Sequence, residues 1–94
     1  MTLPEEITPA QLAALRFIAS FRHVQKLRGA AGYGLPGHKA EVSLVTADKL
    51  LQRRLVRKDL VSRFGRSVWT LTPTGEGRNI LTALEARAER RSMQ

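Results

Sequence analysis

Residues that could do chemistry are concentrated in the stretch 43–72, where arginine and lysine dominate. Between Lys49 and Arg66 the sequence carries seven basic residues against one acidic residue, Asp59, so this segment has a net charge of 7 − 1 = +6 out of +8 for the whole chain. Such side chains neutralise phosphates and donate hydrogen bonds to the edges of bases. The local charge therefore favours a polyanionic partner, which could be a nucleic acid, an acidic protein or an anionic membrane.

Enzyme and metal chemistry have little support in the sequence. Cysteine is absent, which excludes a thiolate nucleophile, a thiolate metal ligand and a disulfide. The two histidines, His23 and His38, stand far apart and lack metal-ligand spacing. Residues 32–37 match the spacing G-x-G-x-x-G, but Pro36 interrupts them and the chain is too short for a nucleotide-binding sheet. We therefore expect a flexible loop there, no catalytic residue, no metal and no cofactor.

Length and composition bound the class of protein. A chain of 94 residues that is 43% hydrophobic predicts one globular domain over residues 1–94, with frayed ends at 1–6 and 89–94. The first residues lack the basic and then apolar pattern of a signal peptide, and no apolar run approaches the roughly 18 residues that cross a bilayer. Together with the absence of cysteine, this predicts a cytoplasmic protein without a membrane partner.

Two helices are indicated before the basic cluster. Thr8, Pro9 and Gln11 form a capping box with proline at the first helical position, which predicts a helix over about 9–23. A second helix is predicted over 43–53, with its polar and basic arc opposite an apolar face of Leu44, Ala47 and Leu51. Between them, residues 24–31 are expected to form one or two helical turns with Val24 and Leu27 inward.

A β-hairpin and a last helix follow. Residues 55–71 alternate about a turn at Gly65, so we expect Trp69 and Leu71 to share one face and to pack in the core beneath the hairpin. For Trp69, a platform that stacks bases is the less favoured alternative. Thr72 and Pro73 provide a cap and a first helical residue for the last helix. Its apolar stripe consists of Ile80, Leu81, Leu84 and Ala88.

From Ile7 to about Ala83 the chain resembles the winged helix-turn-helix domains of the MarR-like bacterial transcription regulators. ITPAQLAALRFI looks like their opening helix, VTADKLLQRRLVRK like their recognition helix running into a wing strand, and SVWTLTPTGEG like the second wing strand with its Leu-Thr-x-x-Gly exit. The family usually has glycine where this chain has Arg54, and residues 29–37 match its second helix poorly. The resemblance implies a mainly α fold with a small β-hairpin, in which a three-helix core is followed by a wing and a C-terminal helix.

Charge and resemblance together predict a sequence-specific double-stranded DNA-binding protein, a small transcriptional repressor that inserts the helix 43–53 in the major groove. Thr46, Lys49, Gln52 and Arg53 are the candidates for base edges, and Arg63 and Arg66 at the hairpin tip would reach the backbone or a minor groove. The predicted DNA-binding residues are Ser43, Thr46, Lys49, Gln52, Arg53, Arg54, Arg57, Lys58, Arg63 and Arg66.

Two questions stay open at this point. One small domain buries too little surface for tight operator binding, so we expect a symmetric homodimer on a palindrome. The stripe Ile80, Leu84 and Ala88 could be its seam, or could pack within its own domain. The alternative function is a protein-interaction module, such as a phage- or plasmid-type inhibitor or co-regulator, that binds a host protein through the same basic surface.

Overall fold

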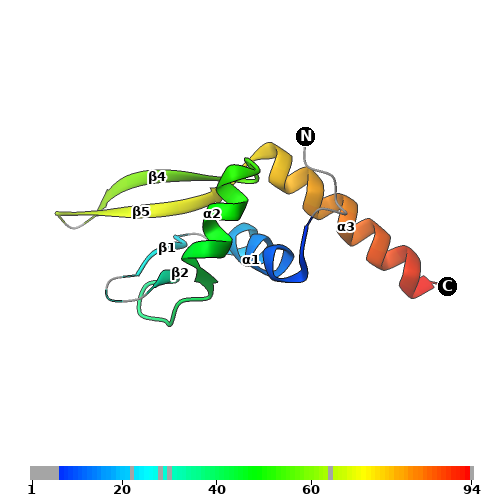
Figure 1. The fold of residues 1–94 in the computed structure, drawn as a ribbon, viewed down its shortest axis with the longest axis horizontal. Coiled ribbons are helices and arrows are strands. Elements are labelled where there is room, and N and C mark those ends of the chain that lie inside the picture. The colour runs from blue at the N-terminus through cyan, green and yellow to red at the C-terminus, as the bar shows by residue number, and fades with distance from the viewer. Residues whose placement is uncertain (1–6, 22, 28, 30, 64, 94) are drawn as a thin grey trace.

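The computed structural model describes residues 7–21, 23–27, 29, 31–63 and 65–93, with side chains except at 63 and 88–93 (Figure 1). The elements follow in the order α1 (Pro9–Ser20), β1 (Gln25–Lys26), β2 (Gly32–Gly34), β3 (Val42–Ser43), α2 (Leu44–Gln52), β4 (Val56–Arg63), β5 (Arg66–Pro73) and α3 (Gly75–Met93).

The described chain is an α+β fold with three helices and a five-stranded antiparallel sheet in the order β3-β2-β1-β5-β4. The predicted architecture, a three-helix core with a small wing and a further C-terminal helix, is therefore wrong. The error lies between α1 and α2, where residues 24–31 were expected to form helical turns and residues 32–37 a loop. The described residues of this segment contain the three short strands β1, β2 and β3 instead, and these extend the hairpin into a sheet.

Glycine makes this unexpected part of the sheet possible. A Cβ atom at Gly32 would collide with the carbonyl oxygen of Val42, and one at Gly34 would lie 2.8 Å from the carbonyl oxygen of Lys39. The segment that leads into β3 can therefore approach β2 only because these positions lack side chains. Tyr33, between them, is buried in the core, and its carbonyl oxygen accepts a 2.9 Å hydrogen bond from the Glu41 amide. The G-x-G spacing serves strand packing, and the predicted flexible loop is wrong at β2.

Helix α1 begins as predicted and ends earlier than predicted. The Thr8 side chain accepts from the Gln11 amide at 3.2 Å, and the Gln11 side chain completes the capping box. The helix stops at Ser20 because Phe21 adopts an extended conformation, and His23 then takes a left-handed φ of 68°. This turn carries the chain into β1, with Val24 buried at its start.

The core lies between the helices and one face of the sheet. Its buried side chains come from all three helices, from the short strands and the residues next to them, and from the base of the hairpin. They are Ala14, Leu15 and Ile18 of α1, Val24, Tyr33 and Val42 between α1 and α2, Ala47 and Leu50 of α2, Leu55, Val56 and Leu71 at the base of the hairpin, and Ile80 and Leu81 of α3. The buried face of α2 is thus centred on Ala47 and Leu50, and Leu44 is partly exposed.

Strands β4 and β5 pair in register over their whole length, from Val56 opposite Pro73 to Arg63 opposite Arg66. Gly65, with φ of 73°, lies in the two-residue turn, as the sequence predicts. Eight residues per strand give the hairpin a length of about 26 Å. Only its base contacts the helices, so its outer half extends beyond α1 and α2 (Figure 1).

Helix α3 starts two residues later than the sequence predicts. Pro73 is the last residue of β5, and Thr74 caps the helix by accepting from the Gly77 amide at 3.1 Å. Ile80, 6% exposed, is part of the core, and Leu84 packs against it. These two residues of the proposed dimer seam therefore pack within their own chain. The side chain of Ala88 lies outside the described part. The backbone is helical to Met93.

Within the residues that the structure describes, none of the helices combines the length and the apolar character that a membrane span requires.

Candidate nucleic-acid interface

The outer face of α2 is the first part of the candidate interface, and the rest of the chain leaves it uncovered. Val45 is 68% exposed, and Lys49 and Gln52 are exposed on the same side. Ser43 caps the helix, since its side-chain oxygen accepts from the Thr46 amide at 3.2 Å. The Ser43 hydroxyl also donates to the Thr46 hydroxyl at 2.9 Å. The helix therefore presents two linked hydroxyl groups at its start and a lysine and a glutamine further along.

The end of α2 forms a hydrogen-bonded cap of the Schellman type around an arginine. The Leu55 amide donates to the Leu50 carbonyl at 3.0 Å, and the Arg54 amide donates to the Leu51 carbonyl at 3.0 Å. Arg54 has φ of 58°, a left-handed conformation that costs a residue with a Cβ atom on the order of 1 kcal/mol. The helix thus ends in the conformation that glycine normally permits, although arginine occupies the position.

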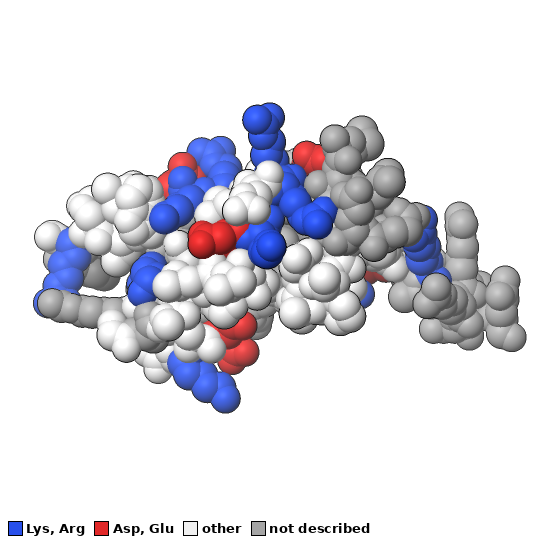
Figure 2. Space-filling model, in the orientation of Figure 1, with Lys and Arg blue, Asp and Glu red and all other residues white. Residues whose placement is uncertain are grey.

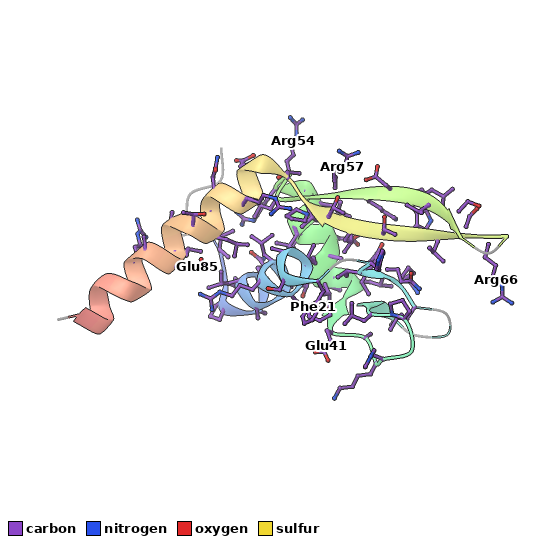
Figure 3. The ribbon with its side chains drawn as sticks, turned by 180° about the vertical axis from the view of Figure 1, so that it is seen from behind. Phe21, Glu41, Arg54, Arg57, Arg66 and Glu85 are labelled. Carbon is purple, nitrogen blue, oxygen red and sulfur yellow. The ribbon has the colours of Figure 1, made fainter. Side chains whose placement is uncertain are left out.

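The corner after α2 is held by contacts with α3. The Thr74 hydroxyl donates to the Arg54 carbonyl at 2.7 Å, and the Thr74 amide donates to the Leu55 carbonyl at 3.0 Å. Gly77 packs directly against the same Leu55 carbonyl, where a Cβ atom would collide with the oxygen. With its backbone fixed in this way, Arg54 directs its exposed side chain away from the molecule (Figure 3).

One of the predicted phosphate contacts on β4, Arg57, is paired with a carboxylate. Arg57 donates two hydrogen bonds to the Asp59 carboxylate, at 2.9 Å and 3.2 Å. These bonds, and then the charge of the carboxylate, raise the pKa of the Arg57 guanidinium above its ordinary value. The two residues lie two apart on one strand and therefore share a face. Arg57 is exposed, but a carboxylate already neutralises it.

The opposite face of the hairpin carries Lys58, Leu60 and Trp69. The ammonium group of Lys58 lies 4.6 Å from the centre of the Trp69 ring, a cation–π arrangement. Trp69 is 42% exposed and Leu60, its partner across the strands, is 56% exposed. Leu71 is buried as predicted, but the prediction that Trp69 packs in the core is wrong. Trp69 lies two residues closer to the hairpin tip than Leu71, and there 42% of its surface stays exposed.

The tip of the hairpin brings two arginines together. Arg63 and Arg66 are directly opposite each other in the register, next to the turn. Arg66 is exposed and marks the far end of the molecule in Figure 3. The side chain of Arg63 lies outside the described part of the chain.

The predicted residues do not form one continuous surface. Arg57 and Lys58 are neighbours in the sequence and therefore point to opposite faces of β4. Figure 2 shows lysine and arginine side chains spread from the corner beside α3 to the hairpin tip instead of gathered in one patch. The structure brings together three groups: the outer face of α2 with the corner at Arg53 and Arg54, the face with Lys58, and the face with Arg57 and Arg66.

Two features of the interface were missed from the sequence. The first, the pairing of Arg57 with Asp59, has a sequence signal, because opposite charges two apart on a strand lie on the same face. The second, the exposure of Trp69, has none, because alternation assigns a face without indicating how far the covering helices reach.

A shallow groove of about 430 Å³ lies between α1 and the start of α2. Its lining is mostly small or apolar: Ala10, Ala13, Ala14, Phe17, Glu41, Val42, Ser43 and Thr46. Glu41 is the one ionisable residue in that lining, so the groove offers no pair of acid and base for catalysis. Across the residues described, no group of three or more His, Cys, Asp or Glu side chains is arranged to hold a metal ion.

The chain matches no family model, no curated protein and no solved structure.

Proposed function

We propose that the chain binds double-stranded DNA as a small transcriptional regulator, with α2 in the major groove and the β4–β5 hairpin along the neighbouring backbone. The observation that carries this proposal is the uncovered outer face of α2 next to a projecting basic hairpin. The likeness of VTADKLLQRRLVRK and SVWTLTPTGEG to MarR-like sequences supports the same use of these two elements.

Dimensions agree with such docking. An α-helix with its side chains is about 10–12 Å in diameter, which fits a major groove about 12 Å wide, and nine residues give α2 a length of about 13 Å along it. The hairpin is about twice as long. It can therefore extend from a groove that holds α2 to the adjacent phosphates or minor groove.

The chemistry of the exposed side chains suggests a division of roles. Lys49 donates to the O6 and N7 acceptors of guanine, and Gln52 pairs with adenine, so these residues read bases. Arg54 and Arg66 contact phosphates, and such contacts position the protein without reading sequence. Arg57 contributes less, because Asp59 neutralises it.

The conformation of Arg54 supports a functional role for its charge. Glycine would relieve the left-handed strain at this position, so packing alone does not account for arginine there. The exposed side chain makes no contribution to the core. A phosphate contact at the corner between α2 and the hairpin accounts for its presence.

Salt dependence gives a quantitative expectation for this interface. If about five phosphates are neutralised, log affinity falls with log salt concentration at a slope of about −4 to −5. Binding as a symmetric dimer remains part of the proposal, because one small module buries little DNA surface. The contact between copies would have to use a surface other than Ile80, which is in the core.

Selection of bound fragments from random DNA, followed by fluorescence anisotropy with a labelled duplex, tests the proposal. Lys49→Ala should reduce the ratio of cognate to random affinity by about 5- to 150-fold, since one base contact contributes about 1–3 kcal/mol. Arg66→Ala should weaken both affinities nearly equally. Lys39→Ala, which removes one charge from the segment between β2 and β3, is the control. It should change neither the ratio of cognate to random affinity nor the salt dependence of binding.

Failure of the full-length chain to bind any duplex at about 100 mM salt would contradict DNA binding. If the same protein instead retained one cellular protein through Lys49 and Arg54, the basic surface would be a protein-binding site.

A further inference from the structure

The hairpin has a second surface with its own chemistry, separate from the outer face of α2. Antiparallel pairing places directly opposed residues on one face and alternates the faces along each strand. Beyond the buried base, one face therefore carries Lys58, the cross-strand pair Leu60 and Trp69, and the pair Ser62 and Ser67. All five side chains are exposed.

Core packing does not account for the tryptophan. At the base of the same face, Val56 and Leu71 are buried against the helices. One register step further out, Trp69 and Leu60 lie beyond the helices and keep 42% and 56% of their surface exposed. The largest aromatic side chain of the chain is therefore placed where a ligand can reach its ring.

Charge on this face is positive and unopposed within the hairpin. Lys58 lies over the Trp69 ring at 4.6 Å. Asp59, the one acidic residue of the hairpin, is on the opposite face and is bonded to Arg57. The hydroxyl groups of Ser62 and Ser67 add hydrogen-bonding groups toward the tip. An aromatic ring with a cation and hydroxyls beside it complements a base that is attached to a phosphate.

The size of the apolar area also favours a base over a protein. Among the described residues of this face, two large apolar side chains are exposed, those of Trp69 and Leu60. A stable protein interface buries about 800 Å² on each partner, far more than two side chains offer. One tryptophan ring, in contrast, is sufficient to stack a single base.

We propose that Trp69 stacks an unpaired base of a single-stranded nucleic acid, with Lys58 contacting the adjoining phosphate. This site is independent of the duplex-binding face of α2. It would let the hairpin hold a strand that is open, frayed or unpaired next to a bound duplex.

The chain contains a single tryptophan, so tryptophan emission, excited at a wavelength where tyrosine does not absorb, reports this site alone. The full chain is titrated with an oligothymidylate of about 12 nucleotides and with an abasic oligonucleotide of the same length and charge. Stacking should quench Trp69 fluorescence with the oligothymidylate and leave it nearly unchanged with the abasic strand. Quenching of equal size by both strands would show that charge, and not a base, is sensed, and would overturn the proposal.

Variants test the same site through the anisotropy of labelled oligothymidylate. Trp69→Ala should raise its Kd by about 5- to 150-fold, which corresponds to the 1–3 kcal/mol of one stacked base. Trp69→Phe should retain most of the affinity, because a ring remains. Phe21→Ala removes an exposed aromatic ring at the end of α1 and is the matched control, with no change expected. An unchanged Kd in Trp69→Ala, with a circular dichroism spectrum like that of the parent, would refute the site.

Duplex affinity separates this proposal from the function proposed above. Trp69→Ala should bind a labelled duplex as tightly as the parent chain. If the parent binds duplex but its tryptophan is not quenched by single strands, only the stacking site is wrong. If it is quenched by single strands and binds no duplex, the duplex-binding proposal fails and the stacking site stands.

Discussion

The hydroxyl group of Thr74 donates a 2.7 Å hydrogen bond to the carbonyl oxygen of Arg54, and this bond joins the end of α2 to the start of α3. The same hydroxyl oxygen accepts from the Gly77 amide at 3.1 Å and so caps α3. One threonine therefore fixes the strained arginine and the first turn of the last helix. Since Arg54 and α2 belong to the proposed interface, the stability of this corner and the binding of DNA are linked.

Replacing Arg54 with glycine should separate stability from binding. Glycine adopts a φ of 58° without strain, so Arg54→Gly should stabilise the chain by about 0.5–1 kcal/mol and raise its Tm by about 2–8 °C. It also removes one phosphate contact, so the salt slope of duplex binding should become shallower by about 1. Thermal unfolding and anisotropy at several salt concentrations measure the two effects.

The neighbouring residue supplies the control. Arg53 has φ of −85°, where glycine gains no relief from strain and adds flexibility to the unfolded chain. Arg53→Gly should therefore lower the Tm. Loss of stability in Arg54→Gly as well would mean that the arginine side chain stabilises the corner, and the argument for a retained DNA contact would be lost.

Local signals in the sequence predicted local structure well. The Thr8 and Gln11 box and the Gly65 turn both depend on residues within four positions of one another, and each is present. The strands β1, β2 and β3 have only two or three residues each. Segments this short show no periodicity of their own, because pairing with distant residues makes them strands. Local sequence patterns could therefore not predict the sheet.

The site residues show the same difference between features set by neighbouring residues and features set by the whole fold. The outer face of α2 followed from helical periodicity, and Lys49 and Gln52 are exposed as that periodicity indicates. Exposure of Trp69 depends on how far the helices extend over the hairpin, which is a property of the whole fold. For Arg54, the departure from the family's glycine led us to expect a different end to the helix, and this was wrong, because arginine adopts the left-handed conformation there.

Two glycines of α3 should respond in opposite directions to the same substitution. A Cβ atom at Gly77 would collide with the Leu55 carbonyl oxygen, whereas one at Gly75 would meet no atom within 4 Å. Gly77→Ala should therefore destabilise the chain by about 1–3 kcal/mol, since backbone must move to make room. Gly75→Ala should stabilise it by up to about 1 kcal/mol through helix propensity.

Urea denaturation of the two alanine variants measures this difference. Equal changes in the free energy of unfolding at the two positions would show that helix propensity, and not contact with Leu55, determines the effect. The close approach of α3 to the hairpin base would then be refuted.

Removing the carboxylate of Asp59 should strengthen DNA binding by releasing Arg57. The guanidinium donates two hydrogen bonds to that carboxylate, which both neutralises the arginine and holds it along the strand. In Asp59→Asn the negative charge is lost and Arg57 is free to contact a phosphate, so the duplex Kd should fall several-fold and the salt slope should steepen by about 1. The unfolding midpoint should change little, because exposed ion pairs contribute little to stability.

A double-mutant cycle with Arg57→Ala distinguishes release of the arginine from a general gain of positive charge. If Arg57 is the released group, Asp59→Asn should improve binding less when Arg57 is already alanine. Arg57→Ala alone should weaken duplex binding less than Arg66→Ala does, since Asp59 neutralises Arg57 in the parent chain. An equal gain from Asp59→Asn in both backgrounds would mean that the carboxylate repels DNA directly and that the pairing with Arg57 has no part in recognition.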